Sequence, residues 1–490
     1  MRIVHITSEA VPWAKTGGLA DVAGALTAYL ARGGHEVTLF LPLYRSIREA
    51  GFDLGSVDRE LGPAELGVDA SAAIRAVSAP DGLRLRLVEA PDLYDRDGLY
   101  GDRSGDHPDN LRRYSVLCRA ALCSLDAAPD ILHTHDWQTA LAPVLLRAGP
   151  PPGATVLVES RPASVFTVHN LAYQGRFPAS EWPLTGLPDE WYTPDRLEYY
   201  GGINLLKGGL IAADRVTTVS PTYAKEISTP EFGFGLEGVI RALPRPVEGI
   251  LNGIDTEVWN PAADPLLGHP YDPADLSGKA AAKRELQKEF DLYTDPSTPL
   301  FGFVSRLVDQ KGMPLFEALA ERLGGMPAQF VFLGRGEPRY EHLIEELGSR
   351  FGNVGARVTF SERLAHLIEA GSDFLLMPSA FEPCGLNQMI SQRYGTVPIV
   401  HEIGGLADSV VPVNPETLKN GTATGIVFRT YDPEAFAAAL ESALGLFGRR
   451  AELRRVIEAG MRTDFSWDAS GREYEQLYAR MLDEAVDSTK

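Results

Sequence analysis

The sequence predicts an α/β protein built from two doubly wound parallel sheets. Short β-branched runs alternate with longer Ala- and Leu-rich stretches of helical period along most of the 490 residues, which is the pattern of βαβ units. The runs are apolar throughout, as in strands that are buried on both faces. One series of units ends in the proline-containing segment 241–249 and a second series follows it, so we expect two domains of similar size.

The predicted strands are located by the points at which the apolar runs end. These points lie near Ile6, Leu41, Leu132, Val168, Val219, Val304, Leu333, Met377 and Val400. Stretches of helical period follow several runs, namely Leu19–Arg32, Leu315–Leu323, Tyr340–Phe351 and Pro433–Phe447. Helical spacing returns over Asp468–Leu482. The segments 149–162 and 261–278 have the composition of surface insertions.

Composition and charge exclude several classes of function. The chain has 46 Lys and Arg against 66 Asp and Glu, a net charge of −20, which argues against a nucleic-acid partner and means that an anionic ligand needs local positive groups. No apolar run approaches the ~20 residues of a membrane helix, and no secretory signal is apparent. The three cysteines, Cys118, Cys123 and Cys384, form no CxxC pair. We therefore expect a protein of the reducing cytoplasm, without a membrane partner.

The first predicted strand leads into a glycine turn that opens a helix. Lys15-Thr16-Gly17-Gly18 precedes Asp21, so backbone N–H groups could approach a phosphate at a helix N-terminus while Lys15 adds a charge. An ordinary glycine turn with a solvated lysine is the alternative.

Two later strands of the first half also end in polar residues. The strand near Leu132 leads into His133-Thr134-His135-Asp136-Trp137, and the strand near Val168 leads into His169-Asn170. Asp136 could bind sugar hydroxyls or cap the next helix, and His169 could face a ligand or belong to the core. The two nearby histidines raise the possibility of a metal, but no further ligand cluster has metal-site spacing. We predict no metal site.

In the second half, the strand near Val304 leads into a loop with two cations. Arg306 offers a planar fork and Lys311 a compact charge, a pair suited to a diphosphate. Glu382 follows the strand near Met377 just before a helix, where complementing the helix macrodipole is the alternative role. A paired glycine turn, Gly404-Gly405, follows the strand near Val400.

These residues share one location, the carboxyl ends of predicted strands. Ligands of open α/β sheets bind there. Cations and glycine turns suit phosphate, whereas Asp, His, Asn and Glu side chains suit hydroxyl groups. The combination predicts a nucleotide-sugar site between two Rossmann-like domains.

The same residues resemble the family of bacterial glycogen synthases and plant starch synthases. Eight motifs occur in the family's order and span nearly the whole chain: KTGGLADV (15–22), HDW (135–137), TVHNLAYQG (167–175), NLLKGG (204–209), NGID (252–255), SRLVDQKG (305–312), EPCGL (382–386) and GGLAD (404–408). The resemblance implies the GT-B fold, in which two Rossmann-like domains face each other across a cleft. We expect these domains at 1–245 and 246–467, with a C-terminal helix over 468–490 that crosses back to the first domain.

The resemblance implies a retaining glucosyltransferase without a cofactor. It would transfer glucose from ADP-glucose to the non-reducing end of an α-1,4-glucan, either glycogen or a maltooligosaccharide, with the domains closing around the donor. The alternatives are a transferase that uses UDP-glucose or makes another glucan, a phosphorylase, which would need a lysine-linked pyridoxal phosphate, and a non-catalytic glucan-binding protein. The intact charged motif residues argue against the non-catalytic alternative.

The resemblance also implies the site residues. The expected catalytic set is Glu382, His169, Arg306, Lys311 and Asp136. The expected set around ADP-glucose is Lys15, Gly17, Gly18, Asp21, Asn252, Phe360, Cys384, Gly385, Leu386 and Tyr100. In these sets Arg306 and Lys311 hold the departing diphosphate, His169 lies near the 6-hydroxyl, and Phe360 stacks on adenine where relatives often have tyrosine.

Two positions depart from the pattern of related sugar transferases. Ile390 stands where many of them carry a second glutamate, which supports the starch-synthase branch. Asn387 replaces a frequent threonine, so the resemblance does not imply a side-chain phosphate contact at this position.

Overall fold

The computed structural model describes residues 1–102 and 105–487. The chain forms two compact units. Unit 1 comprises Met1–Gly253 and Trp467–Lys490, and unit 2 comprises Ile254–Ser466. The chain therefore leaves unit 1 after Gly253, whereas the sequence predicted this boundary at 245. It returns to unit 1 at Trp467, whereas the sequence predicted the return at 468. The last three residues of the expected segment 468–490 lie outside the described residues.

The main sheet of unit 1 is doubly wound. Its order, within the described residues, is β14-β13-β9-β8-β1-β2-β5-β4-β3. Its strands are β1 (Arg2–Ile6), β2 (Glu36–Pro42), β3 (Ser56–Leu61), β4 (Ala72–Ser78), β5 (Arg84–Glu89), β8 (Ile131–His135), β9 (Ala163–Val168), β13 (Arg215–Thr218) and β14 (Glu248–Gly249). Strands β14 to β5 in this order run parallel to one another. The chain order reverses between β1 and β8, and this switch point is where such sheets bind ligands.

Antiparallel strands extend unit 1 beyond its parallel sheet. β4 pairs with β5 and β3 pairs with β4, both antiparallel. A small sheet joins β10 (Arg176–Pro178), β12 (Gly202–Asn204) and β11 (Glu198–Tyr199), and β6 (Gly101–Asp102) pairs with β7 (Gly105–Asp106). The sequence did not predict these strands.

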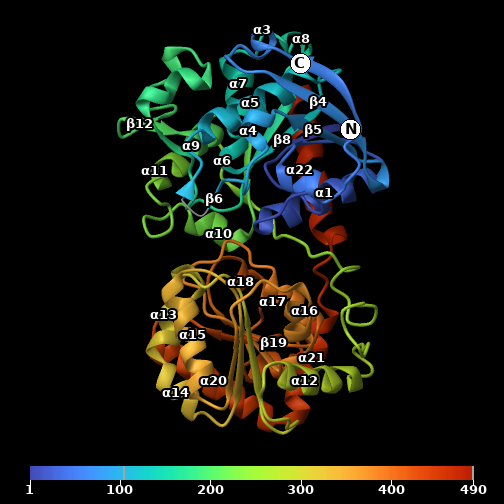
Figure 1. Ribbon diagram of the computed structural model, residues 1–490, viewed down its shortest axis with the longest axis vertical. Helices are drawn as coiled ribbons and strands as arrows, with labels where there is room; N and C mark the ends of the chain where they lie inside the picture. Colours follow the sequence, from blue (N-terminus) through green and yellow to red (C-terminus); the bar gives the residue numbers. More distant parts are fainter. Residues whose placement is uncertain (103–104, 488–490) are drawn as a thin grey trace. The chain divides into compact units, whose positions relative to one another are not determined.

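Helices cover both faces of the parallel sheet of unit 1 (Figure 1). The α-helices are α1 (Gly18–Arg32), α2 (Arg45–Glu49), α3 (Pro63–Leu66), α4 (Pro91–Tyr94), α5 (Asn110–Cys123), α6 (Asp136–Thr139), α7 (Leu141–Ala148), α8 (Val156–Glu159), α9 (Leu205–Ala212), α10 (Pro221–Glu226), α11 (Glu237–Arg241) and α22 (Trp467–Asp487).

Helix α22 returns the chain to unit 1 and packs against α1. Glu475 of α22 accepts a hydrogen bond from the Tyr29 hydroxyl at 3.0 Å and lies 3.0 Å from His35. Tyr478 lies 2.7 Å from His133 of β8. The stripe of large side chains that the sequence spaces along this helix, Tyr474, Leu477, Tyr478 and Met481, is buried.

The sheet of unit 2 is fully parallel in the described residues, with the order β17-β16-β15-β18-β19-β20. Its strands are β15 (Leu300–Val304), β16 (Gln329–Leu333), β17 (Val354–Arg357), β18 (Phe374–Met377), β19 (Val397–His401) and β20 (Ile426–Phe428). In chain order this is 3-2-1-4-5-6, the doubly wound arrangement, and its switch point lies between β15 and β18. Buried phenylalanines of the strands, including Phe301, Phe330 and Phe374, form the core.

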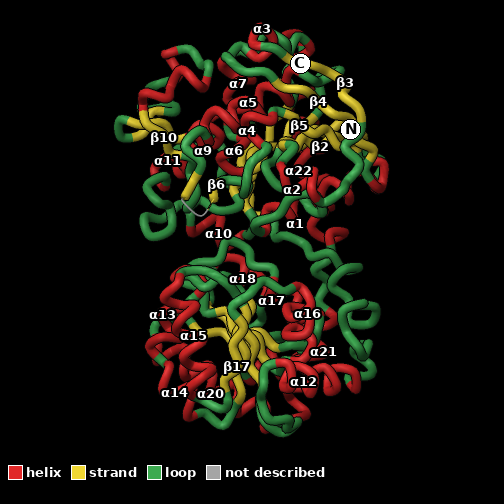
Figure 2. Tube along the Cα trace, in the orientation of Figure 1, coloured by secondary structure: helices red, strands yellow, loops and turns green. Residues whose placement is uncertain are grey.

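Figure 2 shows the strands of unit 2 at its centre with helices on both sides. The α-helices are α12 (Ser277–Glu289), α13 (Met313–Ala318), α14 (Ala320–Gly325), α15 (Pro338–Arg350), α16 (Glu362–Gly371), α17 (Asn387–Arg393), α18 (Gly404–Ser409), α19 (Pro415–Asn420), α20 (Pro433–Gly448) and α21 (Arg450–Arg462). The single helix expected over Leu315–Leu323 is divided at Leu319 into α13 and α14. Among the described residues, no helix combines the length and the apolar character needed to cross a membrane.

Candidate active site

The glycine loop after β1 is organised by a buried carboxylate, Glu9. Its oxygens accept hydrogen bonds from the backbone N–H groups of Thr16 and of Gly17 (3.1 Å), from the Thr16 hydroxyl (2.7 Å) and from the Tyr100 hydroxyl. Sequence reasoning missed Glu9. The signal that could have found it is an acidic residue in the loop between a strand and a glycine turn whose N–H groups need an acceptor.

The sequence expected the Gly17-Gly18 turn to offer its backbone N–H groups to phosphate. The N–H of Gly17 instead donates to Glu9. Gly18 is the first residue of α1, where N–H groups have no intrahelical partner. Lys15 forms an ion pair of 2.7 Å with Asp21 in the first turn of that helix. The structure therefore brings Lys15, Gly18 and Asp21 together at the start of α1.

Asp136 connects the two strand ends on the other side of the unit 1 switch point. Its carboxylate accepts a hydrogen bond from the backbone N–H of His169, at 2.7 Å, and a longer one from Asn170, at 3.4 Å. Asp136 is the first residue of α6, and among the described residues its carboxylate accepts from these N–H groups at the end of β9 rather than capping α6, which the sequence left as one of two roles. Burial raises the pKa of Asp136 to about 7, although the two N–H groups oppose the shift.

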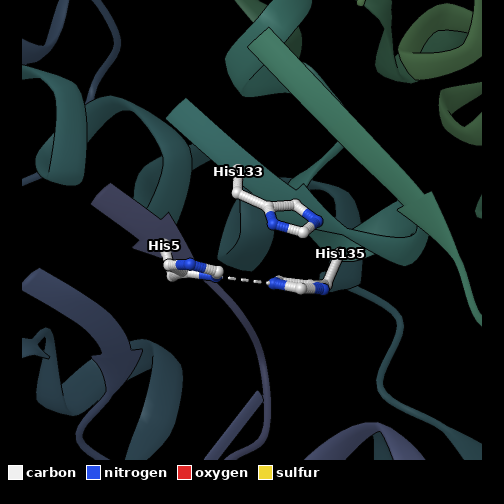
Figure 3. Close-up of side chains that lie close together, drawn as sticks. All are labelled: His5, His133 and His135. Carbon is white, nitrogen blue, oxygen red and sulfur yellow. Dashed lines mark hydrogen bonds between the residues drawn. The ribbon is translucent and has the colours of Figure 1, made fainter. Parts of the chain in front are cut away.

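Three histidine rings form a hydrogen-bonded row that begins in β1 and ends at His169. His5 Nδ1 lies 3.1 Å from His135 Nε2, and His135 Nδ1 lies 3.0 Å from His169 Nε2. Figure 3 shows the His5 and His135 rings edge to edge, joined by the hydrogen bond between them, with His133 beside them. Burial lowers the pKa of His5 and that of His169 to about 3 and lowers the pKa of His135 well below its usual value, so the rings are neutral.

The nitrogens of His5, His133 and His135 lie within 4.8 Å of one another. Those of His133, however, are both engaged, with Tyr478 Oη at 2.7 Å and with Thr167 Oγ1 at 2.6 Å. Both nitrogens of His135 are engaged in the row. A metal ligand must offer a lone pair that is not already committed. The cluster thus has the geometry of a hydrogen-bonded layer rather than of ligands converging on one point.

The unit 2 part of the site lies at the ends of β15 and β18. Lys311, in the loop after β15, forms an ion pair of 2.5 Å with Glu382, in the loop after β18. The turn at Gly312 has φ +85, and a Cβ there would meet Pro378 O at 2.1 Å, so glycine allows the two loops to touch. Arg306 is exposed and makes no side-chain hydrogen bond within the described chain.

Glu382 is held by its own loop and by the paired glycines after β19. The Ser379 hydroxyl donates to its carboxylate at 3.0 Å. The N–H of Gly405 donates to Glu382 O at 3.1 Å. A Cβ on Gly404 would meet the same carbonyl at 2.0 Å, and Gly404 has φ +46. The Gly404-Gly405 turn thus supports the backbone of Glu382. The contacts of the Glu382 carboxylate given above are with Lys311 and Ser379, and these, rather than the helix macrodipole, account for its position.

Of the other predicted residues of unit 2, Cys384, Gly385 and Leu386 follow Glu382 in the same loop. Cys384 is buried, Gly385 has φ +73, and Leu386 immediately precedes α17. Asn387 Nδ2 donates to Val304 O at 2.8 Å, so its amide fixes the end of β15. Phe360, between β17 and α16, is 90% exposed.

The remaining two predicted residues belong to unit 1. Tyr100 joins the glycine loop through its hydroxyl, which contacts both Glu9 and Ser8. Asn252 follows β14 at the end of the first segment of unit 1, and its side chain makes no hydrogen bond to either cluster within the described residues. Most of the predicted residues therefore gather in two clusters, one at the switch point of each sheet, whereas no hydrogen bond of the Asn252 or Phe360 side chain joins it to either cluster within the described residues.

The two halves of the chain match two described protein families. Residues 2–242 match "Starch synthase catalytic domain" and residues 285–459 match "Glycosyl transferases group 1". The chain is 43% identical over 487 residues to "Glycogen synthase 2" of Geobacter sulfurreducens, covering 99% of each chain. It is 44% identical over 487 residues to "Glycogen synthase" of Paramagnetospirillum magneticum, covering 98% of this chain and 97% of the relative.

A solved structure shares the fold over almost the full length. It is the catalytic domain of starch synthase IV from Arabidopsis thaliana, bound to ADP and acarbose. The TM-score is 0.89 at 36% sequence identity, with 98% of this chain and 99% of that chain covered.

Proposed function

This chain belongs to the glycogen and starch synthase family of GT-B glycosyltransferases, and from that premise we propose that it transfers glucose from ADP-glucose to the non-reducing end of an α-1,4-glucan with retention of anomeric configuration. The single observation that carries this proposal is the Lys311–Glu382 ion pair at the switch point of unit 2, next to the exposed Arg306. The ADP bound to the Arabidopsis starch synthase supports the adenosine donor. The identity to curated glycogen synthases supports the acceptor.

The chemical barrier lies in breaking the bond between the anomeric carbon and the diphosphate oxygen. Positive charge then develops on the sugar and negative charge on the departing ADP. Arg306 and Lys311, which follow the same strand, are placed to act on the second charge. A prepositioned interaction of this kind typically contributes ~10²–10³ in rate.

Glu382 acts on the sugar in this proposal, by electrostatic stabilisation rather than as a covalent nucleophile. Its carboxylate is already paired with Lys311 and accepts from Ser379, and both interactions reduce its nucleophilicity. The proton of the acceptor hydroxyl passes to an oxygen of the departing diphosphate, so no separate base is needed. A glucosyl adduct trapped on Glu382 would contradict this role.

Unit 1 supplies groups for the sugar and for the diphosphate. Asp136 and His169, joined by their backbone contact, offer polar atoms for sugar hydroxyls, and Lys15 offers a charge to phosphate. We propose that the two clusters meet the same donor when the units close. Small-angle scattering should show compaction on addition of ADP and maltohexaose, and an unchanged radius of gyration would count against closure.

The proposed reaction also requires no divalent metal, because Arg306 and Lys311 provide the positive charge at the diphosphate. ADP release should therefore persist in EDTA. A loss of turnover on chelation that Mg²⁺ restores would contradict this part of the proposal. The three free cysteines, all buried thiols, support a reducing compartment such as the cytoplasm.

The decisive test is ADP release from ADP-glucose compared with UDP release from UDP-glucose, each with and without glycogen. We expect rapid release from ADP-glucose that depends on glycogen. Preference for UDP-glucose would replace the donor assignment, and glycogen binding without release from either donor would indicate a non-catalytic glucan-binding protein.

A further inference from the structure

The row of histidines in unit 1 reaches the proposed site at one end and the protein interior at the other. We infer that this row fixes the tautomer of His169, so that its Nδ1 presents an N–H group to the substrate, and that His135 is the positioning residue that does so. The inference deepens the proposed function and rests on it for the identity of the substrate. It assigns a role to His5 and His135, which the sequence did not place in the site.

The row permits only two arrangements of its protons. A neutral imidazole has one donor and one acceptor nitrogen, so every ring must point its N–H in the same direction along the row. In the outward arrangement, His5 Nδ1 donates to His135 Nε2 and His135 Nδ1 donates to His169 Nε2. In the inward arrangement, both hydrogen bonds are reversed, and the N–H of His169 lies on Nε2.

The buried end of the row decides between these arrangements. His5 Nε2 is buried and has no hydrogen-bond partner among the described residues. The inward arrangement leaves a proton on this nitrogen, which is a buried donor without an acceptor, whereas the outward arrangement leaves only an unused lone pair. Orphaned buried donors are rarer in proteins than acceptors that lack a partner. The outward arrangement is therefore the one that this interior favours.

Packing holds the middle ring in place. The His133 ring stacks on His135 with centroids 4.3 Å apart, and the hydrogen bond joins His5 to His135 edge to edge, with nearly parallel rings whose centroids are 5.4 Å apart. His133 is itself fixed by Tyr478 and Thr167. His135 thus has little freedom to rotate, and its Nδ1 stays directed at His169.

The outward arrangement determines the chemistry of the exposed nitrogen. His169 Nδ1 makes no hydrogen bond within the described chain, and in this arrangement it carries the proton. It can donate to the oxygen of a sugar hydroxyl or of a phosphate, and it has no lone pair with which to act as a base. This agrees with the proposal that the departing diphosphate accepts the proton of the acceptor hydroxyl.

The first test reads the tautomer directly in the full chain. The ten histidines are labelled with ¹⁵N in the imidazole ring, and His169 is assigned by the signals that disappear in His169→Asn. We expect protonated Nδ1 and unprotonated Nε2 for His169 at neutral pH. Protonated Nε2 would overturn the inference. The measurement needs no donor or acceptor, so it is independent of the proposed reaction.

The second test separates positioning from packing with two matched variants. His135→Phe keeps a ring but removes the hydrogen bond to His169, whereas His133→Phe changes a neighbouring buried ring outside the row. We expect kcat/KM for ADP-glucose to fall about tenfold in His135→Phe, the value of roughly one hydrogen bond, and less than threefold in His133→Phe. Equal losses in the two variants would overturn the role of His135. If neither variant folds, the tautomer of the parent chain decides.

Discussion

Arg306 and Lys311 should respond differently to truncation, although the proposed reaction uses both. Arg306 is exposed and makes no side-chain hydrogen bond within the described residues, so Arg306→Ala leaves no buried group unpaired. Lys311 pairs with Glu382 at 2.5 Å, and only 18% of the Lys311 side chain and 7% of the Glu382 side chain are exposed. Lys311→Ala therefore leaves a nearly buried carboxylate without its cation.

The magnitudes follow from these environments. Each variant should lower kcat by ~10²–10³, because each removes one interaction with the departing diphosphate. Loss of one partner of a buried ion pair costs about 3–5 kcal/mol. The partial exposure of Lys311 reduces this to about 2–3 kcal/mol, or a fall in Tm of about 4–12 °C for a unit of this size. Arg306→Ala should leave Tm unchanged.

The assay is steady-state ADP release with saturating glycogen, combined with thermal unfolding followed by circular dichroism. Arg455→Ala is the control, since Arg455 is an exposed arginine on α21 and should retain both turnover and Tm. Turnover of Arg306→Ala within about threefold of the parent, with unchanged folding, would refute the assignment of the diphosphate site.

Three further predictions follow from the two clusters. Because burial raises the pKa of Asp136 to about 7, the native state loses stability as the pH rises from the ordinary carboxyl pKa toward 7. Asp136→Asn should therefore raise Tm relative to the parent at pH 8, and by less at pH 5. An equal gain in Tm at both pH values would contradict the raised pKa. Glu9→Ala should raise KM for ADP-glucose about tenfold in initial-rate assays, because the glycine loop loses its common hydrogen-bond acceptor. Glu9→Gln keeps an acceptor oxygen and should raise KM less. Identical KM values for the two variants would argue against Glu9 as the organiser of the loop. Gly404→Ala should lower kcat by about 10²-fold by displacing Glu382. Gly421→Ala is the control and should keep its activity, because Gly421 has φ +69 but no atom lies within 4 Å of an added Cβ. An equal loss of activity in both variants would point to backbone strain alone.

Most strands of the parallel sheets could be predicted from the sequence because they are buried on both faces, whereas the parallel strands β5, β17 and β20, which are only partly buried, were not predicted. β16 and β19 are buried at every residue, so their apolar runs are continuous and the polar residues that follow them mark the ligand-binding edge. β3 has the opposite character. Most of its residues, SVDREL, are exposed, and no apolar run distinguishes this antiparallel edge strand from a loop.

Residues of the proposed site could be inferred from the sequence where they follow strands, but not where distant segments meet. Arg306, Lys311 and Glu382 could be found by inspecting strand ends. Glu9 could not be separated from a solvated glutamate, because its partners become apparent only when the loop folds back. His5 and His135 are 130 residues apart in sequence, and only the pairing of β1 with β8 brings them together.

The path of the chain through its two units has a consequence for biosynthesis. Unit 2 is inserted into unit 1, and the ends of the insert are adjacent, since Ile254 N donates to Phe465 O at 2.8 Å. The helix that supplies Tyr478 to the histidine layer is translated only after the whole insert has been synthesised. Until then, the surface of the nascent first unit that binds α22 stays uncovered, while some two hundred residues of the insert are synthesised and form a separate core. We expect the insert to mature before the unit that surrounds it, reversing the order in which their first residues are synthesised.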